Sequence, residues 1–96
     1  MELPFKVDLS KEVVAITGGG GVLMRSFAAA FAECGASVGV IDIDEKACEA
    51  VAEDIRKAGG KAVAAPANCL VRDSIEGAKA KIEKEFGPVT LLVNGA

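Results

Sequence analysis

Four glycines stand in a row near the start of the chain, in the segment Thr17-Gly18-Gly19-Gly20-Gly21-Val22-Leu23. Glycine has no Cβ, so a backbone of this kind approaches a ligand closely and adopts positive φ. A helix that begins directly after the glycines adds free N–H groups and a positive dipole end, which suit a pyrophosphate. The candidate pyrophosphate-binding residues are Gly18, Gly20, Gly21, Val22 and Leu23. The alternative interpretation of the glycine run is a plain tight turn.

A carboxylate, Asp42, follows the glycine loop by about 20 residues, and the next residue is Ile43. An acidic side chain at this spacing can accept hydrogen bonds from both hydroxyls of an adenosine ribose. It also repels a 2′-phosphate, and Ile43 cannot pair with one as an arginine does. The pair therefore predicts NAD rather than NADP. The alternative is that Asp42 only opens the acidic cap of the helix that follows, together with Asp44 and Glu45.

Two further short segments carry polar or small residues of the same kind. Asn68-Cys69 offers an amide that can both donate to and accept from an adenine edge, although Asn68 is equally suited to a loop turn. Asn94-Gly95-Ala96 is small enough to leave space for a ligand beside the glycine loop.

These candidates act together only if the fold brings them to one edge. The sequence predicts strands at Val13–Ile16, Ser37–Ile41, Lys61–Ala67 and Val89–Val93, alternating with helices at Val22–Glu33, from Asp44 to Gly59, and at Asp73–Phe86. Alternation with short loops predicts a parallel α/β sheet of order 3-2-1-4 with helices on both faces, the N-terminal half of a Rossmann-like doubly wound fold. Each candidate then follows a strand, at the carboxyl edge where such folds bind ligands.

Apolar residues at helical spacing predict which helix faces turn inward. The predicted inner residues of the first helix are Leu23, Phe27, Ala30, Phe31 and Cys34. Those of the second are Ala47, Val51 and Ile55, and those of the third are Ile75, Ala78, Ile82 and Phe86.

Composition excludes several classes of function. The chain has 96 residues, room for one domain, and a formal charge of −3, which argues against nucleic-acid binding. It lacks an apolar run long enough to span a bilayer, and its odd set of three cysteines without a C-x-x-C predicts reduced thiols in a cytoplasmic protein. It has no His and no Tyr, so the commonest general base and the phenolic acid are both missing.

At these residues the chain resembles the short-chain dehydrogenase/reductase family. Thr17 and Gly18 match the start of its Thr-Gly-x-x-x-Gly-x-Gly motif, and Asp42 falls at the position of its ribose-binding acid. The second and third motif glycines fall on Val22 and Met24, which is a departure from the pattern.

Two later family motifs match in part. Asn68-Cys69 stands where the family has Asp-Val, and in the Asn-Asn-Ala motif Asn94 and Ala96 match while Gly95 replaces the second Asn. The string Thr-Gly-Gly-Gly-Gly-Val-Leu with Asn-Gly-Ala resembles the D-mannonate (fructuronate) oxidoreductase subgroup.

The resemblance implies the NAD-binding portion of an oxidoreductase, whose parent acts on a sugar acid or another secondary alcohol or ketone. The family's catalytic Ser, Tyr and Lys lie beyond the last residue given, so none of them is assigned here. We therefore expect residues 1–96 to form a dinucleotide-binding half-domain, truncated after the fourth strand, which holds NAD(H) without turning over a substrate.

Two other classes of function stay open. One is a non-catalytic module that senses NAD(H) or adenine nucleotides, and the other is a self-associating structural half, because an uncovered fourth strand invites a second chain. The latter predicts a homo-oligomer. A methyltransferase fragment that binds S-adenosylmethionine shares the acid after the second strand, but it typically carries a G-x-G-x-G loop.

Overall fold

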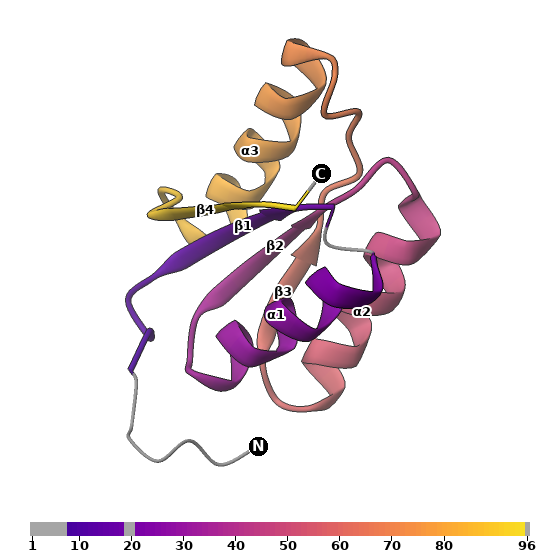
Figure 1. Cartoon of the computed structure of the whole chain (residues 1–96). Helices are drawn as coiled ribbons and strands as arrows, with labels where there is room; N and C mark the ends of the chain where they lie inside the picture. Colours follow the sequence, from indigo (N-terminus) through magenta and orange to yellow (C-terminus); the bar gives the residue numbers. More distant parts are fainter. Residues whose placement is uncertain (1–7, 19–20, 96) are drawn as a thin grey trace.

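A computed structural model describes residues 8–18 and 21–95. The described residues form one parallel sheet of order β3-β2-β1-β4, with three helices (Figure 1). In chain order the elements are β1 (Val13–Thr17), α1 (Val22–Glu33), β2 (Ser37–Ile41), α2 (Glu45–Lys57), β3 (Lys61–Ala64), α3 (Arg72–Phe86) and β4 (Leu91–Asn94). The predicted Rossmann-like order 3-2-1-4 is confirmed.

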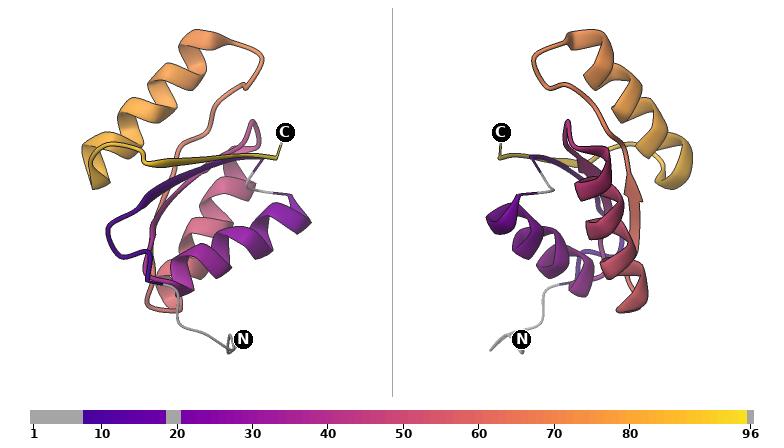
Figure 2. Two further views of the ribbon diagram at one scale, coloured as in Figure 1. Left: turned by 60° about the vertical axis from the view of Figure 1, so that its left-hand side comes forward. Right: turned by 90° about the vertical axis from the view of Figure 1, so that its right-hand side faces the viewer.

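The helices cover both faces of the sheet, with α1 and α2 on one face and α3 on the other (Figures 1 and 2). Successive residues of β1 alternate between the two layers, as the twofold repeat of a strand requires. Val14 and Ile16 belong to the core cluster under α1 and α2, while Val13 and Ala15 belong to the cluster under α3. Both clusters meet at β1, so β1 is the centre of the fold.

Three strands differ from their predicted bounds, and the first of them, β1, runs one residue further, to Thr17. The strand expected over Lys61–Ala67 ends at Ala64, yet Ala65 still donates its N–H to the carbonyl of Val40. The extended chain thus continues beside β2 after β3 ends. The strand expected over Val89–Val93 is shifted toward the C-terminus and spans Leu91–Asn94.

The inner face predicted for α1 was wrong in part, although Phe31 packs against the core as predicted. Leu23 is 68% exposed and Phe27 is 46% exposed, whereas Ala28 is fully buried against the sheet. The residues of α1 that pack against the core are Met24, Ala28, Phe31 and Ala32. Small alanines let the helix lie close to the sheet, and this close approach turns the larger Leu23 and Phe27 outward.

The inner faces of the other two helices were predicted more closely. In α2 the buried residues are Cys48, Val51, Ala52 and Ile55, so Cys48 replaces the predicted Ala47. In α3 all four predicted residues contact the core, with Ala78 and Ile82 buried and Ile75 and Phe86 partly buried.

The β4 side of the sheet is the least covered part of the fold. Within the described residues β4 pairs with β1 alone, and Leu91 and Leu92 on it are 40% and 64% exposed. None of the helices described has both the length and the apolar character needed to cross a membrane.

Candidate functional site

The glycine loop joins β1 to α1 at the carboxyl edge of the sheet. Gly18 has a φ of +70°, a conformation that favours glycine, and its carbonyl accepts the N–H of Gly21 at 3.0 Å. Gly21 precedes the helix and takes no side-chain cap, and the carbonyl of Gly21 accepts the N–H of Arg25. The N–H groups of the first helical turn, including those of Val22 and Leu23, therefore have no acceptor within the helix. Gly20 lies outside the described residues.

Asp42 follows β2 and is partly exposed, as a group that contacts a ligand must be. One of its carboxylate oxygens accepts the N–H of Asp44 at 3.0 Å. The helix cap itself is Asp44, whose carboxylate accepts the N–H of Ala47 at 3.1 Å. The two acids therefore have different structural roles: Asp44 caps α2, and Asp42 stabilises the turn before it.

A pocket of about 240 Å³ joins the ends of the first three strands. Its walls are Gly18, Asp42, Ile43, Asn68, Cys69 and Leu70. The five predicted residues among these come from three separate stretches of sequence, and the fold brings them around one space. Leu70 completes the wall, and its side chain is 95% exposed.

Asn68 has a local structural role as well as its place in the pocket. Its side-chain oxygen accepts the N–H of Leu70 at 3.0 Å, and its own N–H donates to Ser74 Oγ at 2.9 Å. Asn68 is therefore the turn residue that the alternative interpretation expected. Its side-chain nitrogen is the atom able to donate to an adenine ring nitrogen.

The ends of β1 and β4 are joined through Thr17, which is nearly buried. Thr17 Oγ1 donates to Asn94 Oδ1 at 3.0 Å, and the N–H of Gly95 lies 3.1 Å from Thr17 O and 3.2 Å from Thr17 Oγ1. These bonds hold Asn94 and Gly95 beside the glycine loop. Ala96, the last predicted site residue, lies outside the described residues.

Sequence reasoning missed two residues of this edge as site residues. Thr17 was recognised only as the start of a motif, although its hydroxyl positions Asn94. Leu70 gave no usable signal, because a single exposed apolar residue is common on protein surfaces.

Cys48 is buried and contacts Asp42, one of the residues that line the pocket. Burial raises the pKa of the Cys48 thiol to about 11, and the charges of Asp42 and Asp44 add to the rise. The thiol lies 3.6 Å from the carbonyl oxygen of Asp42, to which it donates. Cys48 is therefore a protonated packing residue at neutral pH and not a nucleophile.

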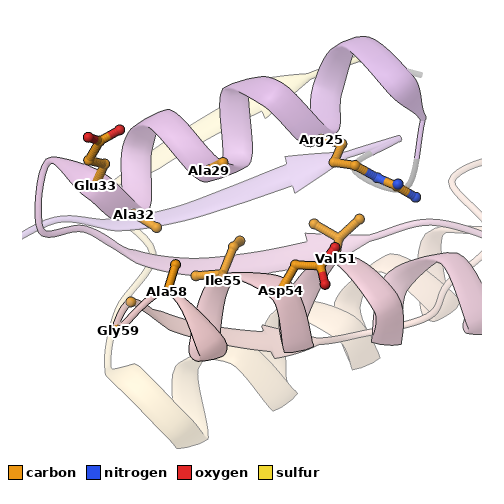
Figure 3. A pocket seen from close by; sticks show the side chains of 10 residues that line it. Arg25, Ala29, Ala32, Glu33, Val51, Asp54, Ile55, Ala58 and Gly59 are labelled. Carbon is orange, nitrogen blue, oxygen red and sulfur yellow. The ribbon is translucent and has the colours of Figure 1, made fainter. Parts of the chain in front are cut away.

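A second pocket lies between α1 and α2, where Figure 3 shows Arg25 at one end and Glu33 toward the other. Ile55 and Val51 rise into it from α2 (Figure 3). None of the predicted site residues lines this pocket. It is thus separate from the predicted nucleotide edge.

Comparison with known proteins agrees with this geometry. A family model described as short chain dehydrogenase matches residues 12–96. The chain therefore belongs to the short-chain dehydrogenase family, whose members generally bind NAD or NADP.

The chain is 34% identical over 96 residues to an uncharacterized oxidoreductase of Haemophilus influenzae, covering 100% of this chain and 34% of that protein. It is 39% identical to the uncharacterized oxidoreductase UxuB of Bacillus subtilis, covering 98% of this chain and 34% of that one. It thus spans about a third of the length of these relatives.

A solved Haemophilus influenzae protein with bound NAD, provisionally described as a D-mannonate oxidoreductase, superposes with a TM-score of 0.90. The identity is 36%, and the match covers 94% of this chain and 32% of that one. The resemblance to this subgroup, inferred from the glycine run and Asn-Gly-Ala, is confirmed.

Proposed function

We propose that the chain binds NAD(H) at the carboxyl edge of its sheet, as the cofactor-binding portion of a short-chain dehydrogenase-type oxidoreductase. The observation that carries the proposal is the pocket in which Gly18, Asp42 and Asn68 meet. These residues follow three different strands. If each were only a turn residue, nothing would require the three to line one common pocket. The similar solved structure with bound NAD supports NAD as the ligand.

The preference for NAD over NADP rests on Asp42 and its neighbour. The Asp42 carboxylate lines the pocket at the end of β2, the position from which an acid contacts the ribose hydroxyls. A 2′-phosphate placed there meets a like charge. Ile43 is 71% exposed beside it and offers an apolar side chain in place of a counter-ion.

Residues 1–96 form, in this proposal, a dinucleotide-binding half-domain that holds the cofactor and performs no hydride transfer alone. The sequence contains no Tyr and no His, so it lacks both the phenolic acid and the commonest general base. The oxidoreductase of which it is a portion acts on a sugar acid or another secondary alcohol or ketone. Support for the sugar acid comes from the similar D-mannonate oxidoreductase.

Calorimetric titration with NAD and NADP tests the site directly. Asp42→Ala should weaken NAD binding by roughly 10- to 100-fold, since hydrogen bonds to a charged group contribute about 1.5–3 kcal/mol. It should also narrow the gap between NAD and NADP. Asp54→Ala is the matched control, because Asp54 is an exposed acid on α2 that lines the other pocket. Equal NAD affinity in the wild type and Asp42→Ala would remove Asp42 from the site.

Self-association is a second candidate property, favoured by the β4 side of the sheet. Leu92 is 64% exposed and β1 is the partner of β4 within the described residues, so the other edge of β4 is open to a second copy. We expect a homo-oligomer, to be measured by light scattering across a concentration series. Leu92→Lys should shift it toward monomer, and a wild-type monomer at high concentration would contradict the proposal.

We also propose a cytoplasmic location for the chain. Its three cysteines, Cys34, Cys48 and Cys69, are all free thiols, as expected in a reducing compartment. Fractionation of cells that express a tagged chain tests this, and recovery with exported proteins would contradict it.

A further inference from the structure

The backbone of Gly95, just after β4, lies directly against the side chain of Met24. A Cβ placed on Gly95 would lie 2.5 Å from Met24 Cγ, 2.6 Å from its Sδ and 2.8 Å from its Cε. All three distances are far shorter than a van der Waals contact. The side chain of Met24, which stands in the first turn of α1, thus occupies the space where any other residue at position 95 would place its side chain.

Hydrogen bonds restrain Gly95, and packing against the core restrains Met24. The N–H of Gly95 is held by Thr17 O at 3.1 Å and lies 3.2 Å from Thr17 Oγ1, so this end of β4 cannot swing outward without losing a hydrogen bond. Met24 packs against the core cluster of the sheet. The conflict begins at its Cγ, so rotating the terminal methyl group alone would not relieve it.

Both positions depart from the family pattern given above, which has glycine at position 24 and asparagine at position 95. In dinucleotide-binding loops the last glycine lets the helix pack closely on the strand. Here the helix carries methionine and the strand end carries glycine. The glycine thus stands at the end of β4 and not in α1, and the two elements can still approach each other closely.

We propose that Met24 and Gly95 are a complementary pair, in which Gly95 supplies the close approach that the third motif glycine otherwise provides. Met24 is then a positioning residue of the nucleotide site. It sets the spacing between the first turn of α1 and the end of β4, which flank the glycine loop at the same edge of the sheet (Figure 2). The effect on nucleotide binding rests on the proposed function, whereas the pairing itself does not.

A double-mutant cycle tests the pair, with melting temperature and NAD affinity as its two readouts. Gly95→Asn should lower the melting temperature by roughly 10 °C through overpacking. It should also weaken NAD binding at least about tenfold, which corresponds to a loss of about 1.4 kcal/mol of binding free energy. Met24→Gly should relieve the conflict, so the double variant should melt higher and bind NAD more tightly than Gly95→Asn alone.

Three further variants sharpen the cycle. Gly95→Ala repeats it with a single added carbon, in case Gly95→Asn does not fold. Met24→Leu keeps a side chain of similar volume and should retain NAD affinity within about twofold, as volume-conserving swaps do. Gly77→Ala is the control, because a Cβ on Gly77 meets nothing within 4 Å.

Affinity is measured by NADH fluorescence at a temperature where every variant is folded, so that loss of binding is not loss of fold. Additive effects of Met24→Gly and Gly95→Asn on the melting temperature would overturn the pairing. Additive effects on NAD affinity alone would overturn the positioning role. If the wild type binds no NAD, the proposed function fails while the melting-temperature cycle still decides the pairing.

Discussion

The two sides of the sheet differ in how completely this chain covers them. On the β2–β3 side every residue of β2 is buried, and Val38 and Val40 are fully enclosed by α2 and its neighbours. On the other side β4 shows no fully buried residue, and Leu92 is 64% exposed. The part of the proposed site around Asp42, which would hold the adenosine, therefore lies beside a fully covered core, whereas the part beside β4 lies next to a core that is only partly covered.

This difference separates a part of the chain whose apolar residues are covered by its own helices from a part whose apolar residues are exposed. The pocket at Asp42 and Asn68 depends on elements whose apolar faces are already satisfied. The apolar groove along β4, with Ile75, Val89 and Leu92 among its walls, depends on α3 alone for cover. Substitutions on the two sides should therefore have very different costs.

The largest expected effect is a loss of stability when a residue on the β2–β3 side of the sheet is truncated. Ile55→Ala should lower the free energy of unfolding by roughly 2–5 kcal/mol, because Ile55 is buried and its removal leaves a cavity. At protein concentrations where the chain is a monomer, Leu92→Ala on the β4 side should change it by less than about 0.5 kcal/mol, because its side chain is exposed there. Urea unfolding of both variants measures the contrast. A similar loss in the two variants would mean that β4 is covered in solution.

The sequence predicted the first two strands because each is a β-branched run that ends at glycine or aspartate. The order of the strands followed from the alternation of strands with helices, which favours a doubly wound sheet. The site residues after β1, β2 and β3 followed from that order and meet in one pocket. The inner face of α1 was predicted wrongly at Leu23, Phe27 and Ala30, because the sequence of the helix is apolar on nearly all sides. The stripes through Leu23 and Phe27 and through Met24 and Ala28 then differ by one residue, and contact with the sheet decides between them.

The contact of Met24 with Gly95 was beyond sequence reasoning for a different reason. Each residue appeared there as a separate departure from a motif. Their relation depends on the distance between α1 and the end of β4, which no local pattern encodes.

The next effect is a loss of stability at alkaline pH, caused by a buried thiol on the β2–β3 side of the sheet. The Cys48 thiol has an ordinary pKa of 9.0, which burial raises to about 11 in the folded chain. The folded state therefore keeps a proton that the unfolded state loses. The contribution of this thiol to the free energy of unfolding is fully present below pH 9 and is lost as the pH rises toward 11. The loss attributable to this thiol should be on the order of 2 kcal/mol.

Urea unfolding at intervals between pH 8 and about 11 measures that loss. Cys48→Ala removes the titrating group, so its stability should fall less steeply over the same interval even though it begins lower. Parallel curves for the two proteins would show that Cys48 does not control the alkaline limit.

A smaller effect compares two thiols, one inside the pocket and one outside it. Cys69 lines the pocket and is partly exposed, whereas Cys34 stands at the end of α1, away from that pocket. NAD at ten times its dissociation constant should slow alkylation of Cys69 about tenfold, because the free site is then about one in eleven. Cys34 should react at an unchanged rate. Equal slowing of both thiols would indicate a general tightening of the chain and not occupation of the pocket.

The smallest effect separates the two acids at the end of β2. Asp44→Ala removes the cap that accepts the N–H of Ala47, and it should cost about 1 kcal/mol of stability. NAD affinity should stay within about twofold of the wild type, because Asp44 is not part of the pocket wall. Asp42→Ala should show the reverse pattern, with the larger change in affinity. If Asp44→Ala weakened NAD binding as much as Asp42→Ala does, the acidic turn would act by placing α2, and the ribose contact assigned to Asp42 would be wrong.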